Sequence, residues 1–220
     1  FNTIVTSDLG EKIAARYGVE TEKTLTGFKF IGEKIARYEK NHEKNYVFGY
    51  EESYGSLIRP FVRDKDAPQA CLMLAEAACY YKAQGKTLVD VLHDLYEQLG
   101  YYRESQTSLT LKGQEGAQRI RQILDTLRQQ QPSSIGGIAV RAVEDYQNAT
   151  RMENGVVSEL TGFTRSNVLK YYLEEGSWIA IRPSGTEPKC KFYYCIRGES
   201  EAQAQEKTAA MQKAVAELIA

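Results

Sequence analysis

The fold of the second half of the chain is decided by Ser177-Trp178-Ile179-Ala180-Ile181-Arg182-Pro183-Ser184-Gly185-Thr186-Glu187-Pro188-Lys189, followed directly by Cys190-Lys191-Phe192-Tyr193-Tyr194-Cys195-Ile196. Its two ends, residues 177–181 and 190–196, are rich in β-branched and aromatic side chains, which predicts two strands. Proline, serine and glycine between them are ordinary turn residues. The stretch therefore predicts two strands joined by one short connection.

The connection carries more polar groups than a turn needs. Arg182, Ser184, Thr186 and Lys189 surround Gly185. Gly185 is able to take a positive φ and to let the main chain approach a ligand closely. A concave turn of N–H groups and hydroxyls binds anions, and arginine adds a bidentate fork for phosphate oxygens. Composition alone favours a plain strand connection, but the combination of these groups, with a cation at each end, favours a phosphate-binding loop.

Residues 104–220 are predicted to form an α+β domain, an antiparallel sheet with helices on one face. We expect its strands at residues 106–111, 138–143, 168–173, 177–181 and 190–196. One helix is expected around residues 117–127, and a final helix is expected to be capped by Ser200. Residues 148–166 are polar and poorly periodic, which predicts a surface loop.

Residues 1–103 alternate strand and helix patterns. Strands are expected at residues 2–6, 19–26 and 46–50, and helices are expected to begin near Asp8, Phe28, Asp66 and Thr87. Capping-box pairs, Asp8 with Glu11 and Thr87 with Asp90, mark two of these starts. The alternation predicts a three-layer α/β domain of βαβ units around a mixed or largely parallel sheet, in which ligands sit beyond the carboxyl ends of the strands.

Three polar turns of this first domain could contact a ligand. Glu51-Glu52-Ser53-Tyr54-Gly55 follows a strand, and its carboxylates could accept hydrogen bonds from sugar hydroxyls, each worth about 1.5–3 kcal/mol. Thr26-Gly27-Phe28-Lys29 opens a helix, where free N–H groups can receive an anion. Arg63-Asp64-Lys65-Asp66 precedes a long helix. On sequence alone, adjacent glutamates at a surface turn are more often merely solvated, and an ordinary helix start with solvated charges is the stronger interpretation of residues 63–66. A plain strand-to-helix turn explains residues 26–29 as well as an anion site does.

Composition excludes several classes of partner. The chain has 28 basic and 29 acidic residues, so its charge gives no reason to expect nucleic acid or an anionic membrane as a partner. Its apolar runs fall short of the roughly 20 residues that span a bilayer. The four cysteines, Cys71, Cys79, Cys190 and Cys195, form no metal-binding pattern and are expected to be small buried residues of a reduced cytoplasmic protein.

The polar motifs together resemble a known family. Gly49-Tyr50-Glu51-Glu52-Ser53-Tyr54-Gly55 resembles the sugar-binding loop of the α-D-phosphohexomutases, and Arg182-Pro183-Ser184-Gly185-Thr186-Glu187-Pro188 resembles their phosphate-binding loop. Residues 24–30 and 63–66 are similar to two further family stretches, in the same order. The resemblance covers essentially all 220 residues and is strongest to the bacterial phosphoglucomutases.

The resemblance implies an isomerase that interconverts glucose 1-phosphate and glucose 6-phosphate. In that family a phosphoserine gives its phosphoryl group to the hexose phosphate through glucose 1,6-bisphosphate, with Mg²⁺ bound. The resemblance assigns substrate binding to Glu51, Ser53, Thr26, Gly27, Phe28, Arg182, Ser184, Gly185, Thr186 and Lys189. It gives Lys65 a catalytic role, stabilising charge on the transferring phosphoryl group.

Two motifs of the complete family are missing from these 220 residues. The sequence contains neither a Thr-Ala-Ser-His-Asn-Pro type of serine loop nor an Asp-x-Asp-x-Asp metal loop. We therefore expect the third and fourth domains, divided at 103/104, of an enzyme whose domains 1 and 2 supply the serine and the Mg²⁺ ligands. A phosphomannomutase or other phosphosugar mutase is an alternative, as is a non-catalytic phosphosugar-binding module.

Overall fold

The computed structural model describes residues 1–185 and 187–220. The chain divides into two compact units, Phe1–Gly100 (unit 1) and Tyr101–Ala220 (unit 2). The first strand of unit 2, β5 (Tyr101–Thr110), begins earlier than the strand expected at residue 106, because all ten of its residues pair with β12 (Lys189–Gly198). The boundary expected at 103/104 therefore falls inside β5.

Unit 1 begins with a βαβ element. The parallel strands β1 (Asn2–Thr3) and β2 (Lys23–Thr24) are joined by α1 (Leu9–Arg16). A second, antiparallel pair consists of β3 (Gly49–Tyr50) and β4 (Ser56–Leu57). Backbone bonds from the Phe1 amine to Phe48 O and from Tyr50 N to Phe1 O link the two pairs. Unit 1 is thus a mixed α/β unit, as predicted.

Helix α2 (Phe28–Asn41) supplies the core of unit 1. Its residues Phe28, Ile31 and Ile35 are buried against Leu57 of β4. The expected buried strand at residues 46–50 is shorter than predicted, since β4 pairs only with Gly49 and Tyr50. The preceding residues of that segment, Val47 and Phe48, are 57% and 40% exposed.

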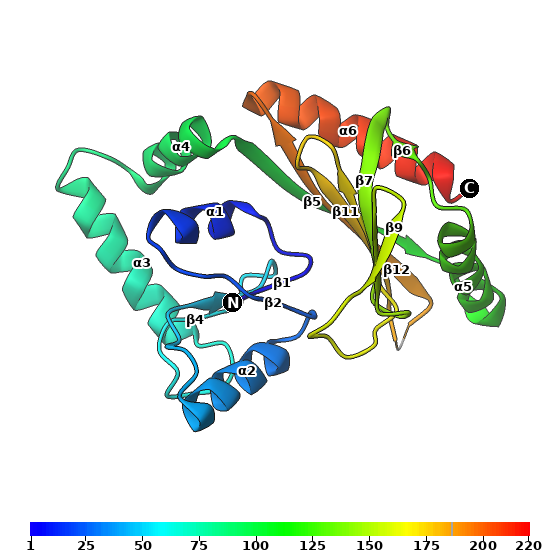
Figure 1. Ribbon diagram of the computed structural model, residues 1–220. Helices are drawn as coiled ribbons and strands as arrows, with labels where there is room; N and C mark the ends of the chain where they lie inside the picture. Colours follow the sequence, from blue (N-terminus) through cyan, green and yellow to red (C-terminus); the bar gives the residue numbers. More distant parts are fainter. Residues whose placement is uncertain (186) are drawn as a thin grey trace. The chain divides into compact units, whose positions relative to one another are not determined.

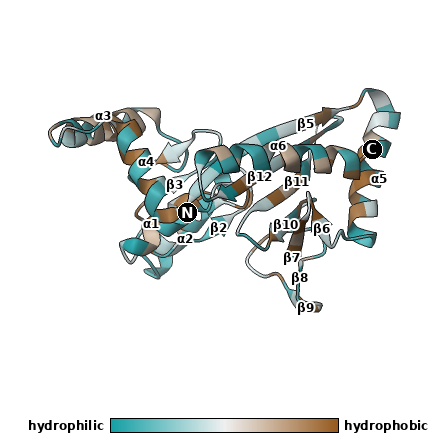
Figure 2. Cartoon of the chain, turned by 90° about the horizontal axis from the view of Figure 1, so that it is seen from above, coloured by the Kyte–Doolittle hydropathy of each residue, from teal (hydrophilic) through white to brown (hydrophobic). Residues whose placement is uncertain are grey.

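Helices α3 (Ala67–Lys82) and α4 (Leu88–Leu99) start as predicted. Asp66 caps α3 by accepting a hydrogen bond from Gln69 N, and Thr87 with Asp90 forms the expected capping box of α4. No residue of either helix is buried. Their apolar segments appear as brown ribbon in Figure 2.

Unit 2 is built on one antiparallel sheet (Figure 1). Its strand order is β5-β12-β11-β10-β7-β8-β9. The strands not yet located are β6 (Ser134–Ile135), which pairs with β7 (Ile138–Asp145), then β8 (Thr150–Glu153), β9 (Val156–Glu159), β10 (Leu169–Leu173) and β11 (Trp178–Pro183). Two helices, α5 (Gly113–Gln129) and α6 (Glu201–Leu218), complete the unit.

Both helices pack on the same face of this sheet. Ile120 and Leu124 of α5 and Met211 of α6 are buried in one core with Tyr171 and Ile179, which lie opposite each other on β10 and β11. Ser200 caps α6 by accepting from Gln203 N, as the sequence predicted. The antiparallel sheet with helices on one face is confirmed.

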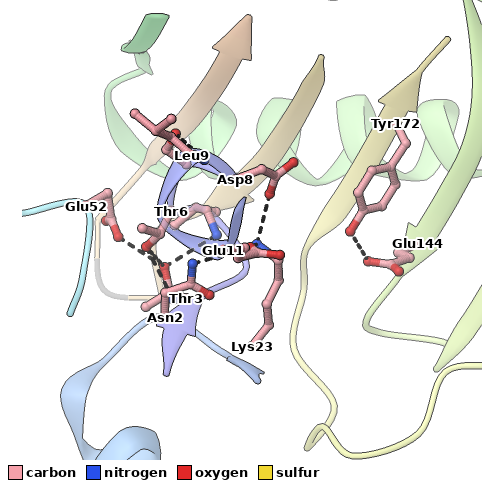
Figure 3. Close-up of polar contacts among 12 residues, drawn as sticks. Asn2, Thr3, Thr6, Asp8, Leu9, Glu11, Lys23, Glu52, Glu144 and Tyr172 are labelled. Carbon is pink, nitrogen blue, oxygen red and sulfur yellow. Dashed lines mark hydrogen bonds and ion pairs between the residues drawn. The ribbon is translucent and has the colours of Figure 1, made fainter. Parts of the chain in front are cut away.

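The other face of the sheet carries a buried polar and aromatic row. Lys170 is fully buried, and its Nζ lies 4.1 Å from the ring centroid of Trp178 and 4.7 Å from that of Tyr172. Glu144, which lies opposite Lys170 on β7, accepts hydrogen bonds from Tyr172 (3.0 Å; Figure 3) and Tyr146 (2.7 Å). The Lys170 amine therefore lies close to two aromatic rings inside unit 2.

Two expectations about surface segments are wrong. The loop expected at residues 148–166 contains the hairpin β8–β9, whose turn residues Asn154 and Gly155 both have positive φ. Cys71 and Cys79 on α3 are exposed, whereas Cys190 and Cys195 are buried as expected. None of the helices in residues 1–185 and 187–220 is long and apolar enough to cross a membrane.

Candidate functional site

The turn between β3 and β4 presents its tip to solvent and buries its first carboxylate. A hydrogen bond of 2.8 Å from Glu51 N to Gly55 O closes the turn. Glu51 is 7% exposed, whereas Ser53 is exposed and Tyr54 is 99% exposed. Tyr54 also has φ 70°, a left-handed conformation that costs a non-glycine residue on the order of 1 kcal/mol. The turn is therefore fixed at its base, and its tip is accessible.

The start of α2 meets this turn at Gly27. Gly27 precedes α2 with φ 121°, a conformation that favours glycine, and its N–H donates to Glu51 Oε1 at 2.8 Å. The N–H expected to receive an external anion is thus bound to a carboxylate of the chain itself. Next to it, the buried Thr26 Oγ1 has no hydrogen-bond partner within the described residues.

Phe28 contributes differently from the other residues predicted at this site. Phe28 is 3% exposed and packs in the core of unit 1. Its ring is therefore not accessible to a ligand. Lys29, the next residue, is exposed, and its Nζ lies 4.9 Å from the ring centroid of Phe30.

Lys65 reaches the same place from the start of α3. Its side chain crosses Gly55 so closely that a Cβ built on Gly55 would lie 2.2 Å from Lys65 Cδ. Its Nζ lies 3.3 Å from Asp64 Oδ1 and 5.8 Å from the ring centroid of Phe28. Three stretches far apart in the sequence thus meet at one turn, and a cation and a carboxylate lie beside one another there.

The sequence did not indicate that β1 also contributes to this turn. Thr3 Oγ1 lies 3.1 Å from Glu52 Oε2, and Thr3 is fully buried (Figure 3). Lys23 of β2 pairs with Asp8 and Glu11, so these acids bind a lysine where a capping box was expected. Burial lowers the pKa of Lys23, but the two carboxylates outweigh it, and the net shift is upward. No short sequence motif could have indicated Thr3, because its contact with Glu52 joins residues 49 positions apart.

In unit 2, the predicted phosphate loop connects β11 to β12 and is closed at its neck. Ser184 N donates to Lys189 O at 2.7 Å, and Ser184 Oγ accepts from Glu187 N at 3.2 Å. Gly185 does not use the positive φ that glycine permits, and a Cβ added there would meet nothing within 4 Å. Thr186 lies outside the described residues.

Positively charged side chains lie where the two strands meet this loop. Arg182 on β11 lies directly opposite Lys191 on β12, and Lys189 begins β12. Within residues 1–185 and 187–220, no ion pair joins any of these three cations to a carboxylate. Cations that lack a counter-ion favour an anionic ligand.

In the part of the chain that the structure describes, no group of three or more His, Cys, Asp or Glu residues could hold a metal ion. Unit 1 has an apolar cavity of about 690 Å³ whose lining includes Ile13, Tyr17, Tyr46 and Phe48. None of the residues predicted to bind substrate lines this cavity. The candidate site therefore consists of the turn at Glu51 and the loop at Arg182, each within its own unit.

Comparison with known proteins gives consistent matches across the chain. Residues 1–99 match the family model "Phosphoglucomutase/phosphomannomutase, alpha/beta/alpha domain III", and residues 128–218 match "Phosphoglucomutase/phosphomannomutase, C-terminal domain". A phosphoglucomutase from Staphylococcus epidermidis is 40% identical over 198 residues, and one from Staphylococcus aureus is 39% identical over 197.

These two matches cover 89% of the chain but only 36% and 35% of the relatives, so the chain spans about a third of their length. A crystal structure of the Paramecium phosphoprotein pp63/parafusin, a phosphoglucomutase, has a TM-score of 0.66 at 20% identity. The match covers 99% of this chain and 37% of the Paramecium chain. At that identity the likeness shows the fold alone.

Proposed function

Because the chain belongs to the phosphoglucomutase/phosphomannomutase family, we propose that it is the substrate-binding part of an enzyme that interconverts glucose 1-phosphate and glucose 6-phosphate. The named relatives are phosphoglucomutases about three times as long as the matched region. The proposal therefore concerns a polypeptide that includes domains equivalent to the rest of those relatives, with domains 1 and 2 as the partners of this part.

The observation that carries the proposal is the convergence on the Glu51 turn. Residues 26–28, 51–55 and 65 are the stretches that resemble the family, and Glu51 bonds Gly27 while Lys65 crosses Gly55. Sequence resemblance alone requires no contact between these stretches. A carboxylate and a lysine at one turn, with a Thr26 hydroxyl that has no partner among the described residues in the adjoining stretch, suit a ligand that carries both hydroxyl groups and phosphate.

Each residue has a role in this proposal. Glu51 and Ser53 bind the sugar hydroxyls between C1 and C6, and Thr26 donates its hydroxyl hydrogen to the same ligand. Lys65 stabilises charge on the phosphoryl group that moves. In unit 2, Arg182, Ser184, Gly185, Thr186 and Lys189 hold the phosphate that does not react. Phosphoryl transfer depends mainly on positioning and charge stabilisation of this kind.

The phosphoserine and the Mg²⁺ are assigned to residues outside this chain. The described residues do not fit a Mg²⁺ site, because they contain no cluster of carboxylates arranged to hold a metal. When bound elsewhere in the enzyme, Mg²⁺ would neutralise charge on the phosphoryl group. These 220 residues then bind and orient glucose 1,6-bisphosphate between the two transfers. A cytoplasmic location remains a prediction from the sequence.

Titration of the 220-residue chain with glucose 1-phosphate, followed by amide shifts in NMR, tests the proposal. We expect shifts at residues 51–55 and at Ser184 and Gly185, with affinity around the millimolar range. Glu51→Gln should remove the first group of shifts and leave the second. Glu159→Gln, which neutralises an exposed carboxylate on β9, is the matched control. Equal shifts with mannose 6-phosphate would favour a broader phosphosugar mutase, and the lack of any shift would refute the proposal.

A further inference from the structure

Thr3 and Thr6 bring their hydroxyl groups together beneath the Glu51–Gly55 turn. A backbone hydrogen bond of 3.0 Å from Thr6 N to Thr3 O closes a tight turn just after β1. This turn places the two hydroxyl oxygens 2.8 Å apart, and Thr3 Oγ1 lies 3.1 Å from Glu52 Oε2 (Figure 3). Thr3 and Thr6 are 0% and 2% exposed, so water does not compete for these bonds.

The direction of the hydrogen bonds follows from the chemistry of the groups. An ionised carboxylate only accepts, so the single hydroxyl hydrogen of Thr3 points to Glu52. Thr3 Oγ1 must then accept from Thr6, whose own oxygen accepts from Thr3 N–H at 3.2 Å. The result is a chain from Thr6 to Thr3 to Glu52, in which each bond polarises and strengthens the next.

The two adjacent carboxylates are consequently tied to two different elements. Glu51 is held by Gly27 at the start of α2, and Glu52 is held by Thr3 at the end of β1. Ser53 and Tyr54, which follow them at the tip, are exposed and have no such support from the core. Fixing both glutamates therefore fixes the backbone direction of the residues that would meet the sugar.

We propose that Thr3 is a positioning residue for this turn: the hydroxyl chain from Thr6 through Thr3 holds Glu52 and thereby orients Glu51 and Ser53 for a hexose phosphate. The inference rests on the proposed function, since it concerns the same site. Thr3 itself touches no substrate. Its contribution is to reduce the number of conformations that the turn must lose on binding.

The experiment compares Thr3→Val, which keeps the shape of the side chain but removes the hydroxyl, with Thr3→Ser, which keeps the hydroxyl. Thr208→Val is the control, because Thr208 is 5% exposed in unit 2 and bonds only a carbonyl of its own helix, Ala204 O. Two quantities are measured on each chain. One is hydrogen exchange of the Glu51 amide, which bonds Gly55 O. The other is the affinity for glucose 1-phosphate by NMR.

Thr3→Val should speed exchange of the Glu51 amide and weaken glucose 1-phosphate binding about tenfold, whereas Thr3→Ser and Thr208→Val should match the parent chain in both. Unchanged exchange in Thr3→Val would overturn the inference whatever the affinity. Faster exchange with unchanged affinity would also overturn it, since the bond would then be structural only. If the parent chain binds no glucose 1-phosphate, the proposed function is refuted, and the inference with it. That result is distinguishable from failure of the inference alone, because it is seen in the parent chain before any substitution is made.

Discussion

Replacing Arg182 with alanine is expected to weaken an inorganic phosphate site at the connection between β11 and β12 until millimolar phosphate no longer fills it. Arg182 lies opposite Lys191, and no carboxylate within the described residues neutralises either side chain. All donors of the site are local to unit 2. The parent chain should therefore bind phosphate by itself, with a Kd of about 1 mM, because only one small and accessible loop contributes.

The size of the effect follows from the bond that is removed. An arginine that binds phosphate with two charge-assisted hydrogen bonds contributes about 1.5–3 kcal/mol. Since about 1.4 kcal/mol corresponds to a factor of ten, Arg182→Ala should weaken binding roughly ten- to a hundredfold. Phosphate would then no longer saturate the loop at roughly 10 mM. The loop is exposed, so salt should also weaken binding in the parent chain.

Phosphate titration followed by amide shifts in NMR measures this directly, with the amides of Ser184 and Gly185 expected to move first. Arg121→Ala is the matched control, because Arg121 is an exposed arginine on α5 and its loss changes the net charge equally. Phosphate affinity that survives Arg182→Ala, or falls equally in Arg121→Ala, would refute the reasoning. So would shifts confined to the Glu51 turn, which would leave this loop as a plain strand connection.

Four further outcomes are expected. The 220-residue chain alone should convert no glucose 1-phosphate to glucose 6-phosphate in a coupled assay with Mg²⁺, because it lacks the serine and metal loops; turnover by the purified chain would contradict this. In the complete enzyme, Glu51→Gln should lower kcat/KM in both directions by roughly ten- to a hundredfold, and an unchanged value would point to another acceptor. Tyr54→Gly should raise the urea midpoint, since it relieves a positive φ worth about 1 kcal/mol; a lower midpoint would show that the ring is packed. Burial raises the pKa of Glu22, but hydrogen bonds from Tyr38, Lys34 and Lys44 outweigh it and lower this pKa from 4.5 to about 2. Glu22 therefore stabilises the fold above pH 4.5 and loses this effect as the pH falls towards 2, and urea unfolding of Glu22→Gln should show a flatter dependence over that range.

Local capping signals were predicted well where no distant group competed for them. Ser200 and Thr87 cap their helices through backbone N–H groups three residues away, and such bonds depend on local sequence alone. Asp8 and Glu11 have the same pattern, yet both carboxylates pair with Lys23 from the neighbouring strand. A tertiary ion pair thus replaced the local bond, and no window around residue 8 contains that information.

The missed hairpin had a readable signal. Glu153-Asn154-Gly155-Val156 contains Asn-Gly, the two-residue turn that best suits a tight hairpin, and both turn residues have positive φ in the structure. The polarity of the flanking residues hid it, since β8 and β9 lie at the edge of the sheet and bury little. Low periodicity was therefore wrongly interpreted as a loop.

At the candidate site, the sequence indicated which stretches carry the polar groups but not their partners. The Gly27–Glu51 and Thr3–Glu52 bonds join residues 24 and 49 positions apart, and both depend on how β1, α2 and the turn pack. Likewise, α3 has an apolar stripe in sequence, but Leu74 is 62% exposed. Periodicity predicts that one face of a helix is apolar, but it does not show that another segment of the same chain packs on that face.

The burial of Trp178 beside Lys170 has a practical consequence for spectroscopy. Trp178 is the chain's single tryptophan, it is 1% exposed, and it lies wholly within unit 2. Its fluorescence emission should therefore report the unfolding of unit 2 alone, whereas far-UV circular dichroism reports the helices of both units. Denaturation curves recorded by the two signals will coincide only if the two units unfold as one cooperative structure, so a single native tryptophan makes that cooperativity measurable without any added label.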